Sequence, residues 1–133
     1  HGTERTGLLQ LAADQIRAAG EPYSSVYLYM LDGDELVLEA HSGRDTEHRR
    51  IAVGHGVCGT AVAAAQDQNV ADVTAAENYI ACNAFTRSEL VVLIHRAGAI
   101  LGQIDIDSDR VGSFTEAEHA AVRRVADGLA VLL

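Results

Sequence analysis

A hairpin pattern near the C-terminal end constrains the fold of this chain more than any other feature. Residues 88–95 and 99–107 are both rich in β-branched and other apolar residues, and the dipeptide Ala97-Gly98 between them is typical of a turn. Two strands joined by so short a connection must pair antiparallel. We therefore predict that this hairpin belongs to an antiparallel sheet.

The second strand of this hairpin carries two carboxylates on one side. Because side chains alternate between the faces of a strand, Asp105 and Asp107 point to one face while Ile104 and Ile106 point to the other. The apolar face predicts core packing. The acidic face has two interpretations, a solvated face of an antiparallel sheet or a site for a cation or an amine.

The pairing register decides whether a third acid joins them. Glu89 begins the neighbouring strand, and a symmetric two-residue turn would pair it with Ile106 and place it on the opposite face from the aspartates. A longer loop or a β-bulge would instead bring Glu89 to Asp105 and Asp107. In that case like charges would raise the pKa of at least one carboxyl, which could then donate a proton near neutral pH.

The rest of the sequence predicts an α+β fold. Apolar positions at helical spacing indicate an N-terminal helix, and a capping pattern at Thr115 and Glu118 opens a C-terminal one with its apolar stripe at residues 121, 122, 125, 129 and 132. The expected helices cover residues 4–19, 60–65 and about 116–132, and the remaining strands cover residues 24–31, 35–40 and 51–53 and a short piece near residue 70. We expect a central antiparallel sheet with the N- and C-terminal helices on one face.

Composition narrows the classes of function. A chain of 133 residues fits one domain, and we expect a single domain over residues 1–133. The net charge of −9 repels phosphates, so we expect neither nucleic acid nor a membrane surface as a partner. All ten basic residues are Arg, which excludes lysine chemistry such as Schiff-base formation. The polar N-terminal residues do not resemble a secretion signal, so we expect a cytoplasmic protein.

Two cysteines are candidates for redox chemistry or for inert burial. Cys58 lies just before the expected helix at residues 60–65, where the helix dipole favours a thiolate, whereas Cys82 lies in a long loop without local activation. The spacing of His48, His55 and the two cysteines matches no standard zinc pattern, so we expect no metal site. His41, His95 and His119 are expected on the surface.

Four motifs in order resemble the free methionine-(R)-sulfoxide reductases, which are enzymes of the GAF (PAS-like) fold. They are Gly54-x-Gly56-Val57-Cys58-Gly59-Thr60-Ala61, Ile80-Ala81-Cys82, Ser88-Glu89-Leu90-Val91-Val92 and Asp105-Ile106-Asp107-Ser108. The resemblance runs from about residue 24 to the last helix. It implies a single GAF domain that reduces free methionine sulfoxide without a cofactor, with thioredoxin or another thiol as the reductant.

The resemblance also assigns roles to residues. It implies that Cys82 attacks the sulfoxide sulfur, becomes a sulfenic acid and releases methionine, after which a second cysteine forms a disulfide. The residues implied to bind the substrate and polarise the sulfoxide are Glu89, Asp105 and Asp107, with the nearby Tyr29 matching a family tyrosine. Local electrostatics favour Cys58 as the reactive thiol, but positioning of the substrate by the carboxylates can outweigh that advantage, so we assign the attack to Cys82.

The sequence departs from this family at three places. A third family cysteine, which commonly resolves the sulfenic acid, is replaced in the region of Glu47 and His48; a tryptophan of the first strand is replaced by Ser25; and Asn83 stands where the family usually has Asp. Recycling would then use Cys58 or an external thiol acting directly on the sulfenic acid. Loss of the aromatic wall would weaken binding of the methyl sulfoxide end.

Two classes of function therefore remain open. The first is a thiol-dependent oxidoreductase acting on free methionine (R)-sulfoxide. The second is a non-catalytic, ligand-sensing GAF domain of a signalling protein, whose flanking helices could pair in a homodimer. A protein that binds methionine-like amino acids without converting them is a third interpretation.

Overall fold

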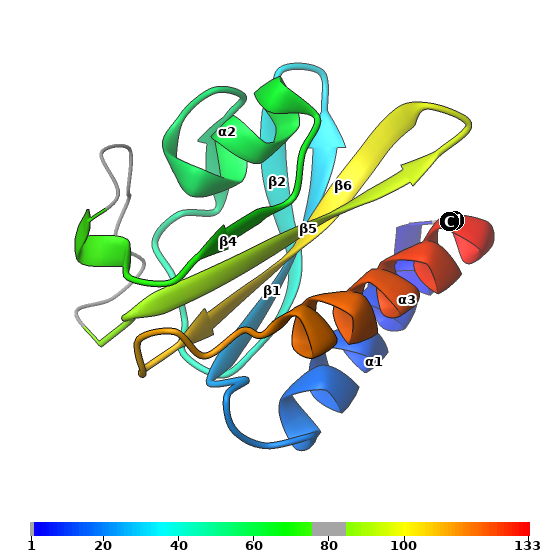
Figure 1. Ribbon diagram of the computed structural model, residues 1–133. Helices are drawn as coiled ribbons and strands as arrows, with labels where there is room; N and C mark the ends of the chain where they lie inside the picture. The colour runs from blue at the N-terminus through cyan, green and yellow to red at the C-terminus, as the bar shows by residue number, and fades with distance from the viewer. Residues whose placement is uncertain (1, 76–84) are drawn as a thin grey trace.

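The computed structural model describes residues 2–75 and 85–133. Its strands pair antiparallel throughout the described residues, in the order β3-β2-β1-β6-β5-β4. The elements in chain order are α1 (Gly2–Ala18), β1 (Ser25–Asp32), β2 (Glu35–Ser42), β3 (Arg50–Ala52), α2 (Gly56–Ala64), β4 (Gln68–Val70), the short 3-10 helix η1 (Val73–Ala75), β5 (Ser88–Arg96), β6 (Ala99–Ser108) and α3 (Glu116–Leu132). The long strands β1, β5 and β6 form the middle of the sheet (Figure 1).

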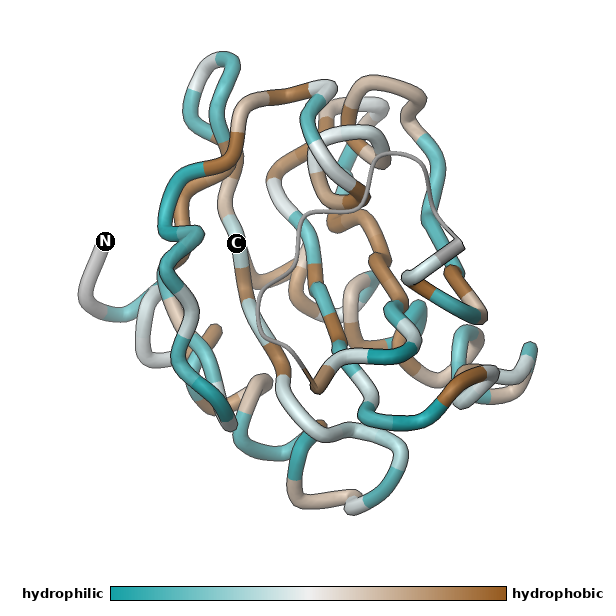
Figure 2. The backbone as a smooth tube through the Cα atoms, turned by 90° about the vertical axis from the view of Figure 1, so that its left-hand side faces the viewer, coloured by the Kyte–Doolittle hydropathy of each residue, from teal (hydrophilic) through white to brown (hydrophobic). Residues whose placement is uncertain are grey.

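Helices cover both faces of this sheet. In Figure 1, α1 and α3 lie side by side on one face and α2 lies on the other. The first face packs strand residues such as Leu28, Val92 and Ile104 against α1 and α3, while the second packs Tyr29 and Leu93 against α2. Hydrophobic segments accordingly follow the strands inside the molecule, and hydrophilic ones follow the outer loops (Figure 2). The predicted α+β class and the placement of both terminal helices on one face are confirmed.

A β-bulge sets the register of the β5–β6 hairpin. Ala97 and Gly98 form a two-residue turn with positive φ angles of 53° and 82°, so the ladder starts symmetrically with Arg96 opposite Ala99. The ladder then shifts, because Ile94 pairs with Gly102 and leaves Leu101 as an extra residue on β6. The shift changes which face every later residue of β6 occupies relative to β5.

Helix α2 begins earlier than the sequence predicts. The glycine-rich segment was expected to be a turn ending at residue 60, but the helix runs from Gly56 to Ala64. Gly59 serves the close approach of this helix to the sheet, since a Cβ atom there would lie 2.4 Å from the Ala52 carbonyl oxygen. Cys58 therefore lies within the first turn of α2 rather than before it.

Helix α3 confirms its predicted cap and corrects its predicted stripe. The backbone N–H of Glu118 donates to Thr115 Oγ1 at 3.3 Å, as the capping pattern predicts. Leu132, however, is 68% exposed. The buried line drifts through Ala126 and Ala130, and Leu132 lies about 200° around the helix from Ala130. Neither this helix nor any other that the structure describes is long and apolar enough to cross a membrane.

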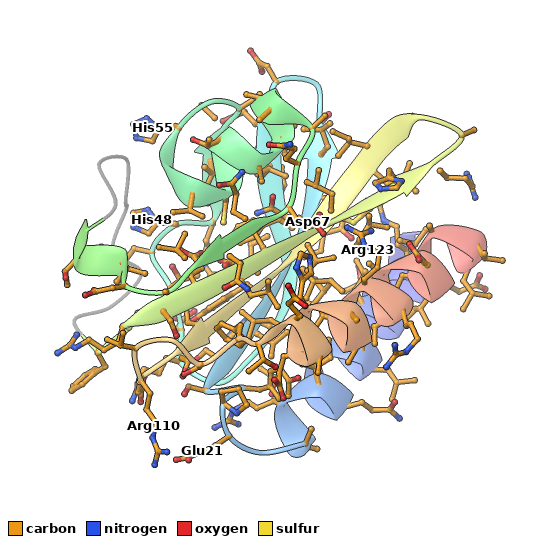
Figure 3. The ribbon with its side chains drawn as sticks, in the orientation of Figure 1. Glu21, His48, His55, Asp67, Arg110 and Arg123 are labelled. Carbon is orange, nitrogen blue, oxygen red and sulfur yellow. The ribbon has the colours of Figure 1, made fainter. Side chains whose placement is uncertain are left out.

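One polar network connects α3 to strand β5. Asp67, in the turn between α2 and β4, accepts hydrogen bonds from Arg123 at 2.5 and 2.6 Å and from the backbone N–H of Leu93 at 2.9 Å. His119 Nε2 lies 2.7 Å from Asp67 Oδ2, so this histidine, about one third exposed, has an acidic partner that the sequence did not indicate. We call Asp67, His119 and Arg123 the Asp67 network; Asp67 and Arg123 face each other in Figure 3.

Candidate functional site

Three buried carboxyl groups converge on the face of the sheet that α2 covers. The bulge places Glu89 opposite Asp107, so Glu89, Asp105 and Asp107 share one face, which we call the acidic cluster. Their exposed fractions are only 3%, 0% and 2%. The interpretation of this strand face as solvated was therefore wrong, because packing from outside the hairpin buries it.

Cys58 contacts this cluster from helix α2. The first turn of α2 buries its side chain, and its Sγ lies 3.8 Å from Glu89 Oε2. One ligand atom each from Cys58, Glu89 and Asp105 lie within 4.8 Å of one another. A thiol and two carboxyl groups from three separate elements thus meet at one buried point.

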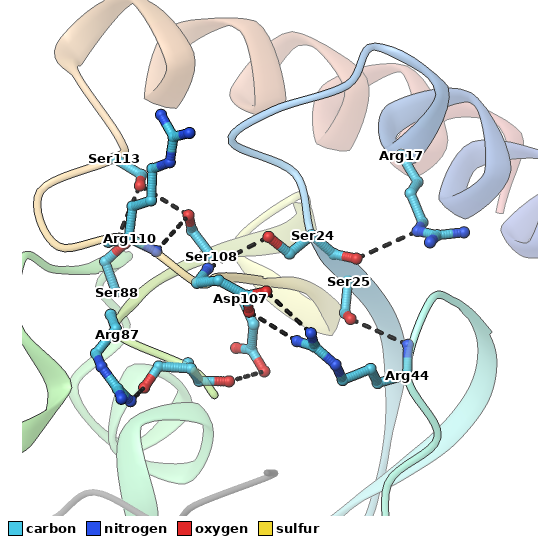
Figure 4. A network of polar contacts seen from close by, with 12 residues as sticks. Arg17, Ser24, Ser25, Arg44, Arg87, Ser88, Asp107, Ser108, Arg110 and Ser113 are labelled. Carbon is cyan, nitrogen blue, oxygen red and sulfur yellow. Dashed lines mark hydrogen bonds and ion pairs between the residues drawn. The ribbon is translucent and has the colours of Figure 1, made fainter. Parts of the chain in front are cut away.

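The acidic cluster receives little hydrogen-bond support from the described residues. Thr86 Oγ1 donates to Asp107 Oδ2 at 3.3 Å (Figure 4). No described residue bonds to the other oxygen of Asp107 or to either carboxyl oxygen of Asp105. Buried acceptors without partners cost stability, which makes them candidates for binding a ligand.

Burial raises the pKa of each of these carboxyl groups. It raises the pKa of Glu89 and of Asp107 well above the ordinary range, and the nearby charge of Asp105 raises both further. The pKa of Asp105 is also raised by burial. Burial and the repulsion between like charges therefore both favour the protonated forms of these carboxyl groups.

The segment between β2 and β3 is fastened beside the acidic cluster. Tyr29 and Tyr27 donate their hydroxyls to the carbonyl oxygens of His48 and Arg44, each at 2.7 Å. The Arg44 guanidinium forms two hydrogen bonds with Asp109, at 2.7 and 2.9 Å, and its Cζ lies 4.6 Å from the ring centre of Phe85. Tyr29 belongs to the same buried cluster as Cys58, and its hydroxyl is directed to the backbone.

Sequence reasoning did not single out Gln103. This residue lies on β6 two positions before Asp105, on the same face, and is fully buried. No described residue bonds to its side-chain nitrogen or oxygen. The alternation that identified Asp105 and Asp107 also extends to Gln103, so the signal was present in the sequence.

A small cavity borders the thiol. Its volume is about 10 Å³, room for about one water molecule. Its lining consists of His48, Ile51, His55, Gly56, Val57, Cys58 and Glu89. His48 and His55 both lie on the α2 side of the molecule in Figure 3. A larger apolar groove of about 380 Å³ runs between α1 and α3, but its lining contains neither acid nor thiol, so we place the chemistry at the smaller cavity.

Cys82 and Asn83 lie outside the described residues, so the role implied for Cys82 stays a prediction.

Comparison with known proteins decides the family. The GAF domain model matches residues 2–133. The chain belongs to the GAF domain family. Among solved structures, this GAF domain superposes on a type II free methionine-R-sulfoxide reductase from Thermoplasma acidophilum with a TM-score of 0.95 and 34% identity, covering 98% of this chain and 93% of that one.

Two further relatives carry the same name. A free methionine-R-sulfoxide reductase from Neisseria meningitidis, solved in complex with its substrate, gives a TM-score of 0.89 at 32% identity and covers 96% of this GAF domain and 76% of that chain. The free methionine-R-sulfoxide reductase of Escherichia coli strain K12 is 40% identical over 105 residues, 79% of this GAF domain and 63% of the relative. This GAF domain thus spans less than two thirds of that curated relative.

Proposed function

We propose that this GAF domain reduces free L-methionine (R)-sulfoxide by thiol chemistry. The observation that carries the proposal is the buried meeting of Cys58 with Glu89 and Asp105, in a chain similar to three free methionine-R-sulfoxide reductases. An amino acid in its free form brings an ammonium group, which needs anionic partners. In this proposal Glu89, Asp105 and Asp107 supply them, and Tyr29 contributes to the wall.

The reaction divides between two thiols. Cys82 attacks the sulfoxide sulfur, the oxygen leaves with the cysteine as a sulfenic acid, and methionine is released with its sulfur reduced. The Cys58 sulfur then attacks the sulfenic acid sulfur of Cys82 and forms a disulfide. The displaced hydroxide takes the proton of the Cys58 thiol and leaves as water. Thioredoxin or another dithiol reduces that disulfide and is oxidised in turn.

The carboxyl groups assist at the departing oxygen. The sulfoxide oxygen must gain a proton as its bond to sulfur breaks, and a carboxyl buried at the site can donate one over a short distance. Because the cavity beside Cys58 holds about one water molecule, we expect substrate binding to move the surrounding side chains.

The test follows methionine formation from purified protein, thioredoxin, its reductase and free methionine (R)-sulfoxide. We expect turnover by the wild type, none by Cys82→Ser, and release of one methionine per chain without further turnover by Cys58→Ser. Asp14→Asn changes an exposed carboxylate on α1 and should keep full activity.

Two outcomes would contradict the proposal. One is an absence of methionine at millimolar sulfoxide while the sulfoxide still shifts the melting temperature, which would indicate a sensing domain. The other is equal turnover by the wild type and Cys82→Ser. The (S)-sulfoxide serves as the matched substrate control.

A further inference from the structure

The point where Cys58 meets the acidic cluster has the composition of a metal site. A sulfur from α2 and carboxylate oxygens from β5 and β6 lie within 4.8 Å of one another, and all three side chains are at least nine-tenths buried. Burying three groups that can each become anionic costs free energy unless protons or a cation neutralise them. A divalent cation would neutralise two of them at once.

Asp105 gives the second, independent indication of a ligand. It is fully buried, and no described residue bonds to either of its carboxyl oxygens. One of those oxygens belongs to the group of ligand atoms that also includes Cys58 Sγ. A buried carboxylate that has no donor among the described residues, and that faces a thiol and a second carboxylate, is arranged for a cation.

We propose that Cys58, Glu89 and Asp105 bind one zinc ion when the thiol is reduced. Zinc lies about 2.3 Å from a thiolate and about 2.1 Å from a carboxylate oxygen, so tetrahedral angles separate the two ligand atoms by about 3.6 Å. The distance from Cys58 Sγ to Glu89 Oε2 is 3.8 Å, close to that value. A thiolate ligand favours zinc over Mg²⁺ and Ca²⁺, which prefer oxygen alone.

The fourth coordination position opens toward the small cavity. The cavity has room for about one water molecule and is lined by Cys58 and Glu89 together with His48 and His55. A water molecule completes the tetrahedron in the simplest arrangement. The sequence predicted no zinc site because it offered only the spacing of histidines and cysteines, whereas the fold unites a different set of ligands from three elements.

Zinc binding goes beyond the proposed reductase activity and would oppose it. A zinc ion on Cys58 occupies the thiol that we assign to disulfide formation and two of the carboxylates that we assign to the substrate. Oxidation of Cys58 to a disulfide removes the thiolate ligand and would release the ion. The binding itself requires neither substrate nor turnover, so it can be tested separately.

The test uses Co²⁺ as a spectroscopic probe and Zn²⁺ as its competitor on the reduced, chelator-treated protein. A thiolate bound to Co²⁺ gives a charge-transfer absorption band. We expect the band to saturate at one Co²⁺ per chain and to disappear on addition of one equivalent of Zn²⁺. Titration with Mg²⁺ or Ca²⁺ should leave it unchanged.

Variants assign the ligands. Cys58→Ser and Cys58→Ala should abolish the band, and Asp105→Asn should weaken Zn²⁺ binding at least about tenfold. Asp107→Asn is the matched control, a buried carboxyl on the same strand and face but outside the three-ligand group, and should change the affinity by less than about threefold. Circular dichroism establishes that each variant is folded.

The proposal is overturned by any of three results. These are the absence of a thiolate band in the folded wild type, a band that persists without Cys58 but vanishes in Cys82→Ser, and equal weakening by the Asp105 and Asp107 variants. Because each readout is binding rather than turnover, loss of the reductase activity alone leaves this test intact.

Discussion

Two acidic sites contact strand β5, the half-buried Asp67 and the buried acidic cluster, and the residues around them differ sharply in the hydrogen bonds they supply. Asp67 receives hydrogen bonds from Arg123 and from the backbone of Leu93, with His119 at its other oxygen. No described residue donates a hydrogen bond to either carboxyl oxygen of Asp105. A fully partnered acid fastens the fold, whereas an unpartnered one weakens it and stays available for a ligand.

The pKa values of the two regions shift in opposite directions. Burial alone would raise the pKa of Asp67, but hydrogen bonds from Arg123 and His119 lower it overall. Burial raises the pKa of Asp105, and the smaller, opposing influence of Glu89 and Cys58 does not offset it. Asp67 therefore contributes stability above its unfolded pKa that is lost as the pH falls, while Asp105 contributes a penalty that grows as the pH rises above its unfolded pKa.

The largest expected effect comes from removing the partnered acid. We expect Asp67→Asn to lower the free energy of unfolding by about 3 kcal/mol, because it removes the closer of the two carboxylates that contact the mostly buried Arg123 guanidinium. Urea denaturation at pH 7 measures the change. Asp127→Asn, which removes a weaker and more exposed partner of the same arginine, is the control. An equal loss in both variants would contradict the special role of Asp67.

Removing a charge from the acidic cluster should stabilise the protein rather than destabilise it. We expect Asp105→Asn to raise the free energy of unfolding by about 1 kcal/mol at pH 8, because the amide carries no charge to bury. The gain should vanish below about pH 4, where the unfolded carboxyl is also protonated. Urea denaturation between about pH 4 and pH 8, with a chelator present, measures the gain in stability and its loss at low pH. The prediction fails if the free energy of unfolding of the wild type rises between pH 5 and pH 8 as steeply as that of Asp105→Asn.

The smallest effect tests how the Asp67 network divides its contributions. His119 is about one third exposed at its side chain, so its contact with Asp67 is screened more than the Arg123 contact. We expect His119→Ala to cost about 0.5 to 1 kcal/mol. Chemical denaturation of His119→Ala and Asp67→Asn under the same conditions gives the ratio of their losses in unfolding free energy. A loss as large as that of Asp67→Asn would show that the histidine, rather than the arginine, holds the aspartate.

Local sequence patterns predicted the elements of this fold and part of its site. Alternation placed Asp105 and Asp107 on one face, and the capping pattern located the start of α3, because both depend on neighbouring residues only. The register of Glu89 was left open, since it depends on the bulge at Leu101 across two strands. The burial of the acidic face was not predicted, because the contact comes from helix α2, whose Cys58 lies 31 positions from Glu89 in the sequence.

The remaining expectations depended on other information. The contact of His119 with Asp67 was not predicted, because the two residues lie 52 positions apart in the sequence. The roles of Cys82 and Tyr29 came from family resemblance, and that of Cys82 stays a prediction. Dimer formation and a cytoplasmic location likewise stay predictions.

The bulge at Leu101 determines which side chains of β6 share a face with Glu89. If all residues were kept and the ladder ran unbroken from Arg96 and Ala99, Glu89 would pair with Ile106 and the two aspartates would lie on the opposite face from Glu89. Deletion of Leu101 itself would only close the bulge and leave Glu89 opposite Asp107. A one-residue insertion or deletion between Gly102 and Asp107 would shift this register, so we expect it to disturb the site more than most substitutions in the hairpin. An irregularity of the backbone, rather than a reactive side chain, keeps the three acids on the face that Cys58 contacts.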